Sequence, residues 1–452
     1  MGQRADELLA QARKDVPLAG RRGEESLLLA KAKGCQVFDA DNVAYLDLLG
    51  GAGTNLLGYG NQYVLDAVRR ASTMGLASGF HIAAELELVE LLREHAPALS
   101  PWAVTPSESE AWELALRWCR RDTGRRLVIV FDGNRRGAVE TFHVTASGPL
   151  GVSQPMVAGI PAEHARLVRV VPWGDAEVLS NVLAEVGVDT AAVVLDPIAA
   201  QFGVIRPTPD FIRAVMKATR AAGARLVLDE TLTGFRLARG GAAEVFGIEP
   251  DVAVFGGALG GGVARIGAVA WARTLAASPG DELPGPPPPI AILAAVATLS
   301  VLRNESVHQR LEERGADLEA GVAALAERFS RPLRCSRVGS ILACAFSRQG
   351  VTDGNSLRGS IRKRGGVSRA PAARPASCCR PARRSRPSSR TLTATRISSK
   401  PSPPWKPGSR RCRRRTSCRE APDSSPPPAH PAHSRQFPHD DSRQLPPILP
   451  PS

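Results

Sequence analysis

Lysine is scarce in the first 350 residues of this 452-residue chain. Arginine supplies nearly all of the positive charge there. A lysine amine is the side chain that forms Schiff bases with carbonyl compounds, so such chemistry would depend on very few residues. None of them follows a segment that reads as a sheet strand, and we therefore predict no amine at the carboxyl end of a sheet. The lysines concerned are Lys14, Lys31, Lys33 and Lys217.

Long apolar runs are missing as well. The longest, Ile290–Leu302, is shorter than the roughly 20 residues needed to span a bilayer, and its spacing predicts a buried helix. The first 20 residues are charged and amphipathic, without the apolar core of a secretory signal. The sequence therefore predicts a cytoplasmic protein with no membrane partner.

Cysteines are few and scattered. Cys35, Cys119, Cys335 and Cys344 lack the paired spacing of a metal site, and the other four cysteines follow residue 350. We predict no metal site, and we interpret these four as reduced core residues of a cytosolic protein.

Residues 351–452 differ in composition from the rest. They hold 22 of the 58 Lys and Arg residues but 5 of the 44 acidic ones, so the net charge of +14 comes from this tail and the body is mildly acidic. The tail also holds 18 of the 37 prolines and cannot bury a core. One reading is a frameshift, because Ser399–Ser409, back-translated and shifted, can read as a plausible terminal helix. The other is a disordered basic tail for RNA or acidic partners, but with Trp405 and Phe437 as its only aromatics a nucleic-acid partner is not expected.

The body alternates strand-like and helix-like segments. Such alternation predicts an α/β fold with a mostly parallel sheet covered on both faces, whose ligands lie beyond the carboxyl ends of the strands. We expect strands at 127–131, 167–171, 192–195, 226–229, 252–255 and 266–271, helices at 63–72, 85–95, 110–121, 176–185 and 210–222, and a hairpin at 37–48.

Two segments carry a specific pattern. Leu226–Arg236 reads as a buried strand, Asp-Glu and Thr-Gly-Phe-Arg, and Pro250–Gly262 reads as Pro-Asp, a second strand and a glycine-rich turn. They resemble the class-III aminotransferases, which depend on pyridoxal phosphate (PLP), and among these most closely the glutamate-1-semialdehyde aminomutases. The likeness runs in family order over roughly residues 20–345. It includes Ala32–Asp47, Ser107–Ala111, Phe131–Gly133 and Asp196-Pro197.

The resemblance implies fold type I of the PLP-dependent transferases, with a large domain and a smaller α/β domain. The small domain would comprise residues 1–60 and a truncated 286–350, and the large domain residues 61–285, followed by the tail at 351–452. Truncation would uncover the apolar faces of Ala291–Leu302 and Leu318–Phe329. The resemblance further implies PLP as cofactor, a small amino or keto acid as substrate, and a dimer.

The resemblance also assigns site residues. Ser107 and Ser109 would hold the cofactor phosphate at a helix start, and Asp229 would face the pyridine nitrogen. Taken alone, Ser107 could equally be an N-cap in a capping box with Glu110, and Asp229 an ordinary strand-end carboxylate. The Schiff-base lysine of the family falls on Gly257, so no catalytic residue can be assigned.

Other positions depart from the family pattern. Glu108 replaces a glycine and would repel a phosphate or fill the anion site itself. Arg135 and Arg136 replace a Tyr-His pair, either altering the pocket or forming a solvated surface loop, and Pro284 replaces a threonine. Three hypotheses follow: a family member that has lost PLP aldimine chemistry, a PLP-independent enzyme that reuses the pocket, or a non-catalytic partner of an intact paralogue.

Overall fold

The computed structural model describes residues 3–15, 28–75, 79–134, 137–263, 265–275, 283–304 and 306–346. Arg135, Arg136 and the tail at 351–452 lie outside these residues, so both readings of the two arginines and both readings of the tail stay predictions.

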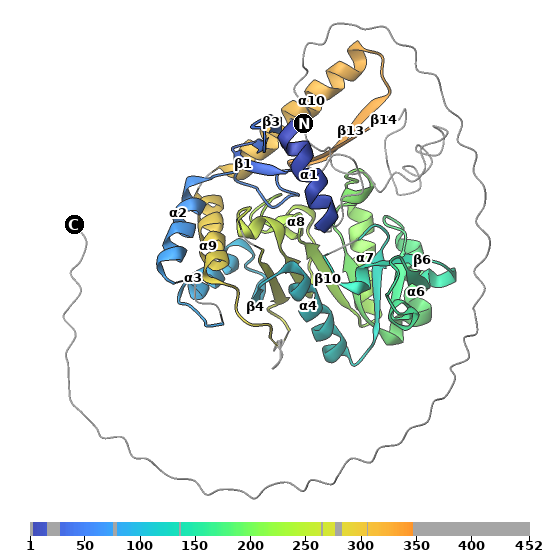
Figure 1. Ribbon diagram of the computed structural model, residues 1–452. Coiled ribbons are helices and arrows are strands. Elements are labelled where there is room, and N and C mark those ends of the chain that lie inside the picture. The colour runs from blue at the N-terminus through green and yellow to red at the C-terminus, as the bar shows by residue number, and fades with distance from the viewer. Residues whose placement is uncertain are drawn as a thin grey trace, which may run out of the picture. The chain divides into compact units, whose positions relative to one another are not determined.

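A seven-stranded sheet forms the centre of the described chain (Figure 1). Every neighbouring pair is parallel except the two made by the strand at 267–272, which runs against both neighbours. The mostly parallel α/β fold predicted from the sequence is thereby confirmed. In order across the sheet the strands are β4 (Leu99–Thr105), β12 (Gly267–Ala272), β11 (Val252–Phe255), β10 (Arg225–Glu230), β9 (Thr190–Leu195), β5 (Leu127–Phe131) and β8 (Val168–Val171).

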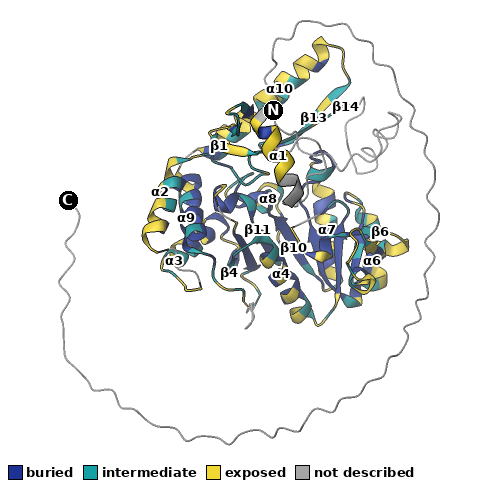
Figure 2. Ribbon diagram, in the orientation of Figure 1, coloured by how far each residue is buried: buried dark blue, intermediate teal, exposed yellow. Residues whose placement is uncertain are grey.

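Alternate residues of these strands enter two separate cores. On β10, Leu226 and Leu228 belong to one core and Val227 to the other, because successive side chains point to opposite faces. The first core includes residues of α6 (Ala176–Val186) and α7 (Pro209–Ala221), and the second includes residues of α4 (Glu108–Thr123). Both faces of the sheet are therefore covered, which explains its continuous apolar strands (Figure 2).

A group of helices packs beside the sheet. Helix α9 (Pro289–Asn304) lies against α2 (Gln62–Thr73) and α3 (Ala84–His95), and most of its side chains are buried. The expectation of an uncovered apolar face is therefore wrong for Ala291–Leu302. It holds for α10 (Val307–Arg328), where Leu318 and Leu325 are about half exposed.

Smaller elements complete the described chain. A three-stranded antiparallel sheet of β1 (Leu29–Lys33), β2 (Gln36–Asp39) and β3 (Ala44–Leu46) takes the place of the expected hairpin. A separate hairpin of β13 (Leu333–Val338) and β14 (Ile341–Phe346) follows α10. The predicted domain boundaries stay predictions. The other strands and α-helices of the described residues are α1 (Gln3–Asp15), β6 (Val144–Ala146), β7 (Ser153–Pro155), α5 (Ala162–Arg166) and α8 (Gly241–Phe246), and short 3-10 helices lie at Glu140–Phe142, Pro149–Gly151, Gly187–Asp189, Ala200–Phe202 and Gly257–Gly260.

The cysteines are distributed differently from the prediction. Of the four cysteines in the described residues, only Cys119 is a core residue; Cys35 and Cys344 are exposed and Cys335 is half-buried. Burial raises the pKa of the Cys119 thiol, so this group is inert. Within the described residues, no cluster of three or more potential metal ligands occurs.

Among the described helices, none is by itself long and apolar enough to cross a membrane; α9 and α10 meet the length and composition test only as a pair bent by 78°.

Candidate functional site

The candidate site lies where β10 and β11 end side by side. Glu230 pairs in register with Phe255, so Thr231 and Gly256 leave the sheet at the same edge. Strand β4 is parallel to β11 and is separated from it by β12. It leads into α4, so the start of α4 lies at this edge of the sheet too. The structure thus brings the segments around Asp229, Gly257 and Ser107 together, as the topology of parallel strands predicts.

Gly257 has a backbone conformation that favours glycine. Its φ is +46°, in the left-handed region that side chains disfavour. A Cβ atom at this position would lie 2.7 Å from the carbonyl oxygen of Thr231, a backbone atom that cannot swing aside. Any side chain at position 257 therefore requires the glycine-rich turn or the 231 peptide to move.

Asp229 is buried at the end of β10. Its Oδ1 accepts hydrogen bonds from the Thr231 amide at 3.1 Å and from the Thr231 hydroxyl at 2.6 Å. These bonds agree with the strand-end reading of Asp229, because they hold the first residue of the following turn. The role beside a pyridine nitrogen stays a prediction.

Glu230 is the buried acid that sequence reasoning left unassigned. Its carboxylate accepts hydrogen bonds from the amides of Ala242 at 3.0 Å and Ala243 at 2.8 Å, at the start of α8, and from the hydroxyl of Thr233. Burial nevertheless dominates and raises the pKa of Glu230 to about 7. The side chain anchors a short helix to the sheet edge and changes charge near neutral pH.

Both serines at the start of α4 make hydrogen bonds within the protein. Ser107 is the N-cap, with its side chain accepting from the Glu110 amide at 3.3 Å, so the N-cap is confirmed and the capping box with Glu110 stays a prediction. Ser109 Oγ accepts from the Ala138 amide at 3.2 Å, which ties α4 to the loop that follows β5. The predicted phosphate contacts of both serines stay predictions.

The Glu108 side chain packs against the glycine-rich turn. A Cβ atom at Gly256 would lie 2.9 Å from Glu108 Oε2, so the carboxylate rests against the Gly256 backbone. It does so at the positive end of the α4 dipole, a place that favours an anion. This position fits the hypothesis that the protein supplies its own anion where the family resemblance would put a phosphate.

Two further residues at this edge were missed by the sequence analysis. Asn134 follows β5, is 5% exposed, and has no partner for its side-chain nitrogen or oxygen among the described residues. Arg236 donates from Nε to the Leu232 carbonyl at 3.0 Å and from its terminal nitrogen to the Gly53 carbonyl. Burial lowers the pKa of Arg236 to about 10, which still leaves it charged at neutral pH. Only the Arg236 motif carried a sequence signal.

No lysine lies at this edge among the described residues. Lys33 ends β1, so the prediction that no lysine ends a strand is wrong for it, but β1 belongs to the three-stranded sheet and Lys33 is exposed. Lys31 lies on the same strand, and Lys217 is exposed on α7. Lys14 is in α1. The described residues thus do not fit a PLP group held through a Schiff base.

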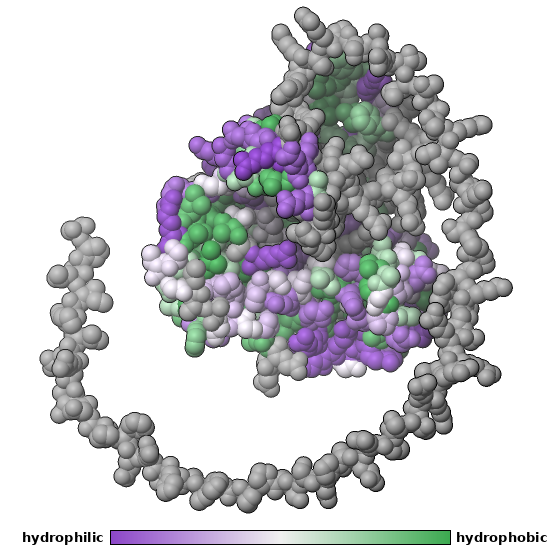
Figure 3. Space-filling model, in the orientation of Figure 1, coloured by the Kyte–Doolittle hydropathy of each residue, from purple (hydrophilic) through white to green (hydrophobic). Residues whose placement is uncertain are grey.

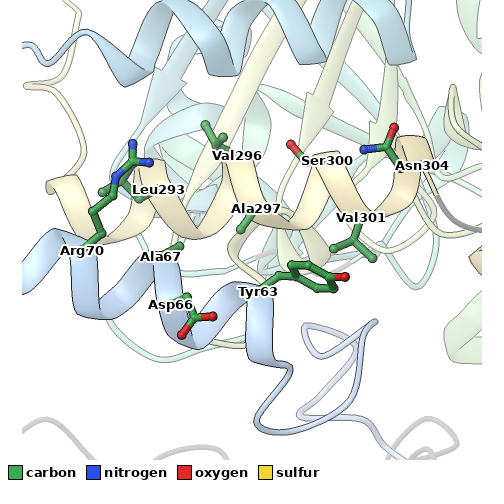
Figure 4. A pocket seen from close by; sticks show the side chains of 10 residues that line it. All are labelled: Tyr63, Asp66, Ala67, Arg70, Leu293, Val296, Ala297, Ser300, Val301 and Asn304. Carbon is green, nitrogen blue, oxygen red and sulfur yellow. The ribbon is translucent and has the colours of Figure 1, made fainter. Parts of the chain in front are cut away.

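A groove of about 370 Å³ opens elsewhere, between α2 and α9 (Figure 4). Apolar side chains of α9 form its floor, and Tyr63 of α2, 61% exposed, stands at one end. Figure 3 shows apolar side chains gathered on the same side of the molecule. The groove is lined by Tyr63, Asp66, Ala67, Arg70, Leu293, Val296, Ala297, Ser300, Val301 and Asn304.

Comparison with known proteins gives a consistent result. A family model described as aminotransferase class-III matches residues 19–367. The glutamate-1-semialdehyde 2,1-aminomutase of Persephonella marina is 30% identical over 354 residues, covering 75% of this chain and 80% of the relative. The enzyme of the same description from Sorangium cellulosum is 35% identical over 342 residues, covering 72% and 76%.

Solved structures of this kind resemble the chain as well. An omega-transaminase from Sphaerobacter thermophilus superposes with a TM-score of 0.72 at 26% identity, covering 79% of this chain and 85% of that one. A glutamate-1-semialdehyde aminomutase from Pseudomonas aeruginosa PAO1 gives 0.70 at 25% identity, covering 79% and 83%. A lysine-to-alanine variant of the Pseudomonas protein, in complex with PMP, matches equally well.

Proposed function

Because the chain belongs to the class-III aminotransferases, a family with PLP-bound members, we propose that it is a glutamate-1-semialdehyde aminomutase-like protein that has lost Schiff-base chemistry. The observation that carries the proposal is the backbone at Gly257. A lysine there would be strained at φ +46° and would need more room beside the Thr231 carbonyl than the present 2.7 Å. The difference from the family pattern at position 257 thus lies in the backbone conformation of the turn as well as in the missing lysine side chain.

A binding function without catalysis remains compatible with this proposal. A Pseudomonas aminomutase variant with alanine in place of a lysine is described in complex with PMP, the amine form of the cofactor. We infer that any cofactor held by this chain is held without a covalent bond. The Glu108 carboxylate beside Gly256 opposes a phosphate at the α4 start, so we expect weak binding of both PLP and PMP.

The second candidate function is that of a non-catalytic partner. The groove between α2 and α9 supports it, because Tyr63 is exposed beside the groove and a side chain of a second protein could enter between the two helices. We propose a dimer, either of two copies or with an intact paralogue, located in the cytoplasm. A small amino or keto acid remains the proposed ligand class.

The test uses the full-length protein with PLP and, separately, with PMP. After addition of PLP and borohydride, we expect intact-mass and peptide analysis to find phosphopyridoxyl adducts within residues 1–350 only on exposed lysines such as Lys33 and Lys217, in amounts that rise with PLP concentration without saturating. A stoichiometric adduct that saturates at low PLP concentration on any side chain there would refute the proposal. Calorimetric titration with PMP, which has no aldehyde, measures non-covalent binding independently; we expect weaker binding than a Glu108→Gly variant shows.

A further inference from the structure

Two cysteines that are nine positions apart in the sequence face each other on the last hairpin of the described chain. Cys335 of β13 and Cys344 of β14 are directly paired in the antiparallel register. Their sulfur atoms are 2.7 Å apart, and a disulfide bond requires about 2.05 Å. Opposite residues of an antiparallel pair have Cβ atoms about 4.5–5.5 Å apart and a disulfide holds them at about 3.5–4.5 Å, so closure draws the two strands slightly together.

The surroundings hold this pair in place. Arg337 lies two residues from Cys335, on the same face of β13, and its guanidinium bonds Glu312 and Glu319 of α10, both at 2.8 Å. The opposite face packs on the main body, where Val338 is buried with Ile198 and Val204. The hairpin is thus fixed from both sides, and the two thiols are oriented before any reaction takes place.

Access to the pair is unequal. Cys344 is exposed and Cys335 is half-buried. Burial and the neighbouring Cys344 raise the pKa of Cys335 to about 12, so its thiol is a poor first nucleophile. We therefore expect an oxidant to react first with Cys344. The Cys335 sulfur is then close enough to attack the modified Cys344 sulfur.

We propose that Cys335 and Cys344 form a redox-sensitive pair that closes to a cross-strand disulfide under thiol-oxidising conditions. With oxidised glutathione, the Cys344 thiolate attacks one sulfur of the glutathione disulfide, and one glutathione thiolate leaves. Cys335 then loses its proton to solvent and attacks the Cys344 sulfur, and a second glutathione thiolate leaves. Two protein thiols are oxidised by two electrons, and one glutathione disulfide is reduced to two thiols.

Formation of the disulfide would stabilise the whole β13–β14 hairpin. A two-stranded hairpin is marginally stable by itself and depends on what it packs against. The disulfide would keep β13 and β14 paired even when the contacts of Arg337 or Val338 open, so exchange of the backbone amides of 333–346 should slow by about tenfold or more.

The experiment equilibrates the full-length protein with reduced and oxidised glutathione, blocks free thiols, digests with trypsin without reduction and maps the peptides. Cleavage after Arg334, Arg337 and Arg348 separates the two cysteines, so the disulfide joins Cys-Ser-Arg to the peptide 338–348. We expect this linked pair in the wild type and in Cys35→Ser, and its loss in Cys335→Ser and Cys344→Ser. Hydrogen exchange of residues 333–346 is measured on the same samples.

Denatured protein provides the matched reference. Because the fold positions the sulfurs, the equilibrium constant for closing this pair should be at least about tenfold higher in the native protein than in denaturant. Glutathione adducts on Cys344 without the linked peptides, links from Cys344 to the cysteines after residue 350, or equal constants in the native and denatured states would each overturn the proposal.

Discussion

At the scale of single residues, the turn after β11 decides which side chains the site can hold. Introducing lysine by Gly257→Lys should fail to restore a borohydride-trappable PLP adduct. It should also destabilise the protein by roughly 1–3 kcal/mol, because a side chain at φ +46° is strained and its Cβ meets the Thr231 carbonyl. Denaturant unfolding and peptide mapping after reduction measure the two effects.

Gly60→Lys is the matched control for that substitution. Gly60 is exposed, has φ +74°, and a Cβ there would have nothing within 4 Å. It isolates the backbone penalty from the steric one, so Gly60→Lys should cost less than Gly257→Lys. An equal loss of stability in both variants would show that the Thr231 contact has no effect.

Glu230 should make the stability of the protein depend on pH. Its folded pKa is raised from 4.5 to about 7, so the folded state binds a proton more tightly than the unfolded chain. Stability from this group is therefore greatest below pH 4.5 and declines as the pH rises toward 7, by roughly 3 kcal/mol in all. A Glu230→Gln variant should lack this decline.

The measurement is the difference in unfolding free energy between wild type and Glu230→Gln at several pH values between 5 and 8. Titrating groups that do not interact with Glu230 are common to both proteins and cancel, and Asp229 is the charged neighbour that does interact with it. The wild type should lose stability relative to the variant as the pH rises; a constant difference would mean that burial does not perturb Glu230.

At the scale of secondary-structure elements, the N-cap of α4 distinguishes two roles for Ser107. As a cap, Ser107→Ala should cost about 1 kcal/mol of unfolding free energy, with the same loss in the presence and absence of added phosphate. Ser180→Ala serves as control, since the Ser180 hydroxyl donates to the Ala176 carbonyl one turn back in α6 and is not a cap. A loss that grows with phosphate concentration would instead indicate an anion site.

Most of the helices and strands could be predicted from the sequence. Strands β5, β10 and β11 and helices α4 and α7 lie within a few residues of their predicted positions, because apolar residues recur with the required period. Strand β4 was missed, since Leu99–Thr105 contains a proline and mixed polar residues. The strand forms because it pairs with β12, which is distant in the sequence. Such pairing is a tertiary effect that a local sequence pattern does not predict.

At the scale of the whole molecule, the groove between α2 and α9 should mediate dimer formation. Tyr63→Asp should weaken the dimer by about tenfold or more, because a charge replaces an aromatic side chain that a partner would cover. Light scattering after gel filtration over a range of concentrations measures this. Val188→Asp, at a side chain that is 86% exposed on a different element, should leave association unchanged.

A wild-type protein that is monomeric at all concentrations would argue against both the homodimer and this interface. A dimer unaffected by Tyr63→Asp would argue against the interface alone. Co-purification with a lysine-bearing relative would favour the heterodimer.

The sequence by itself determined most of the strands and helices and the scarcity of lysine in the first 350 residues, because periodicity and residue identity are local properties. The tertiary structure decided the rest. It bonded Arg236 to Gly53, which is 183 residues away, set Gly257 against Thr231, buried Glu230 beneath α8, and placed Cys335 opposite Cys344. Such contacts depend on how distant segments pack together, and a backbone φ or the pKa of a buried acid exists only after that packing is complete.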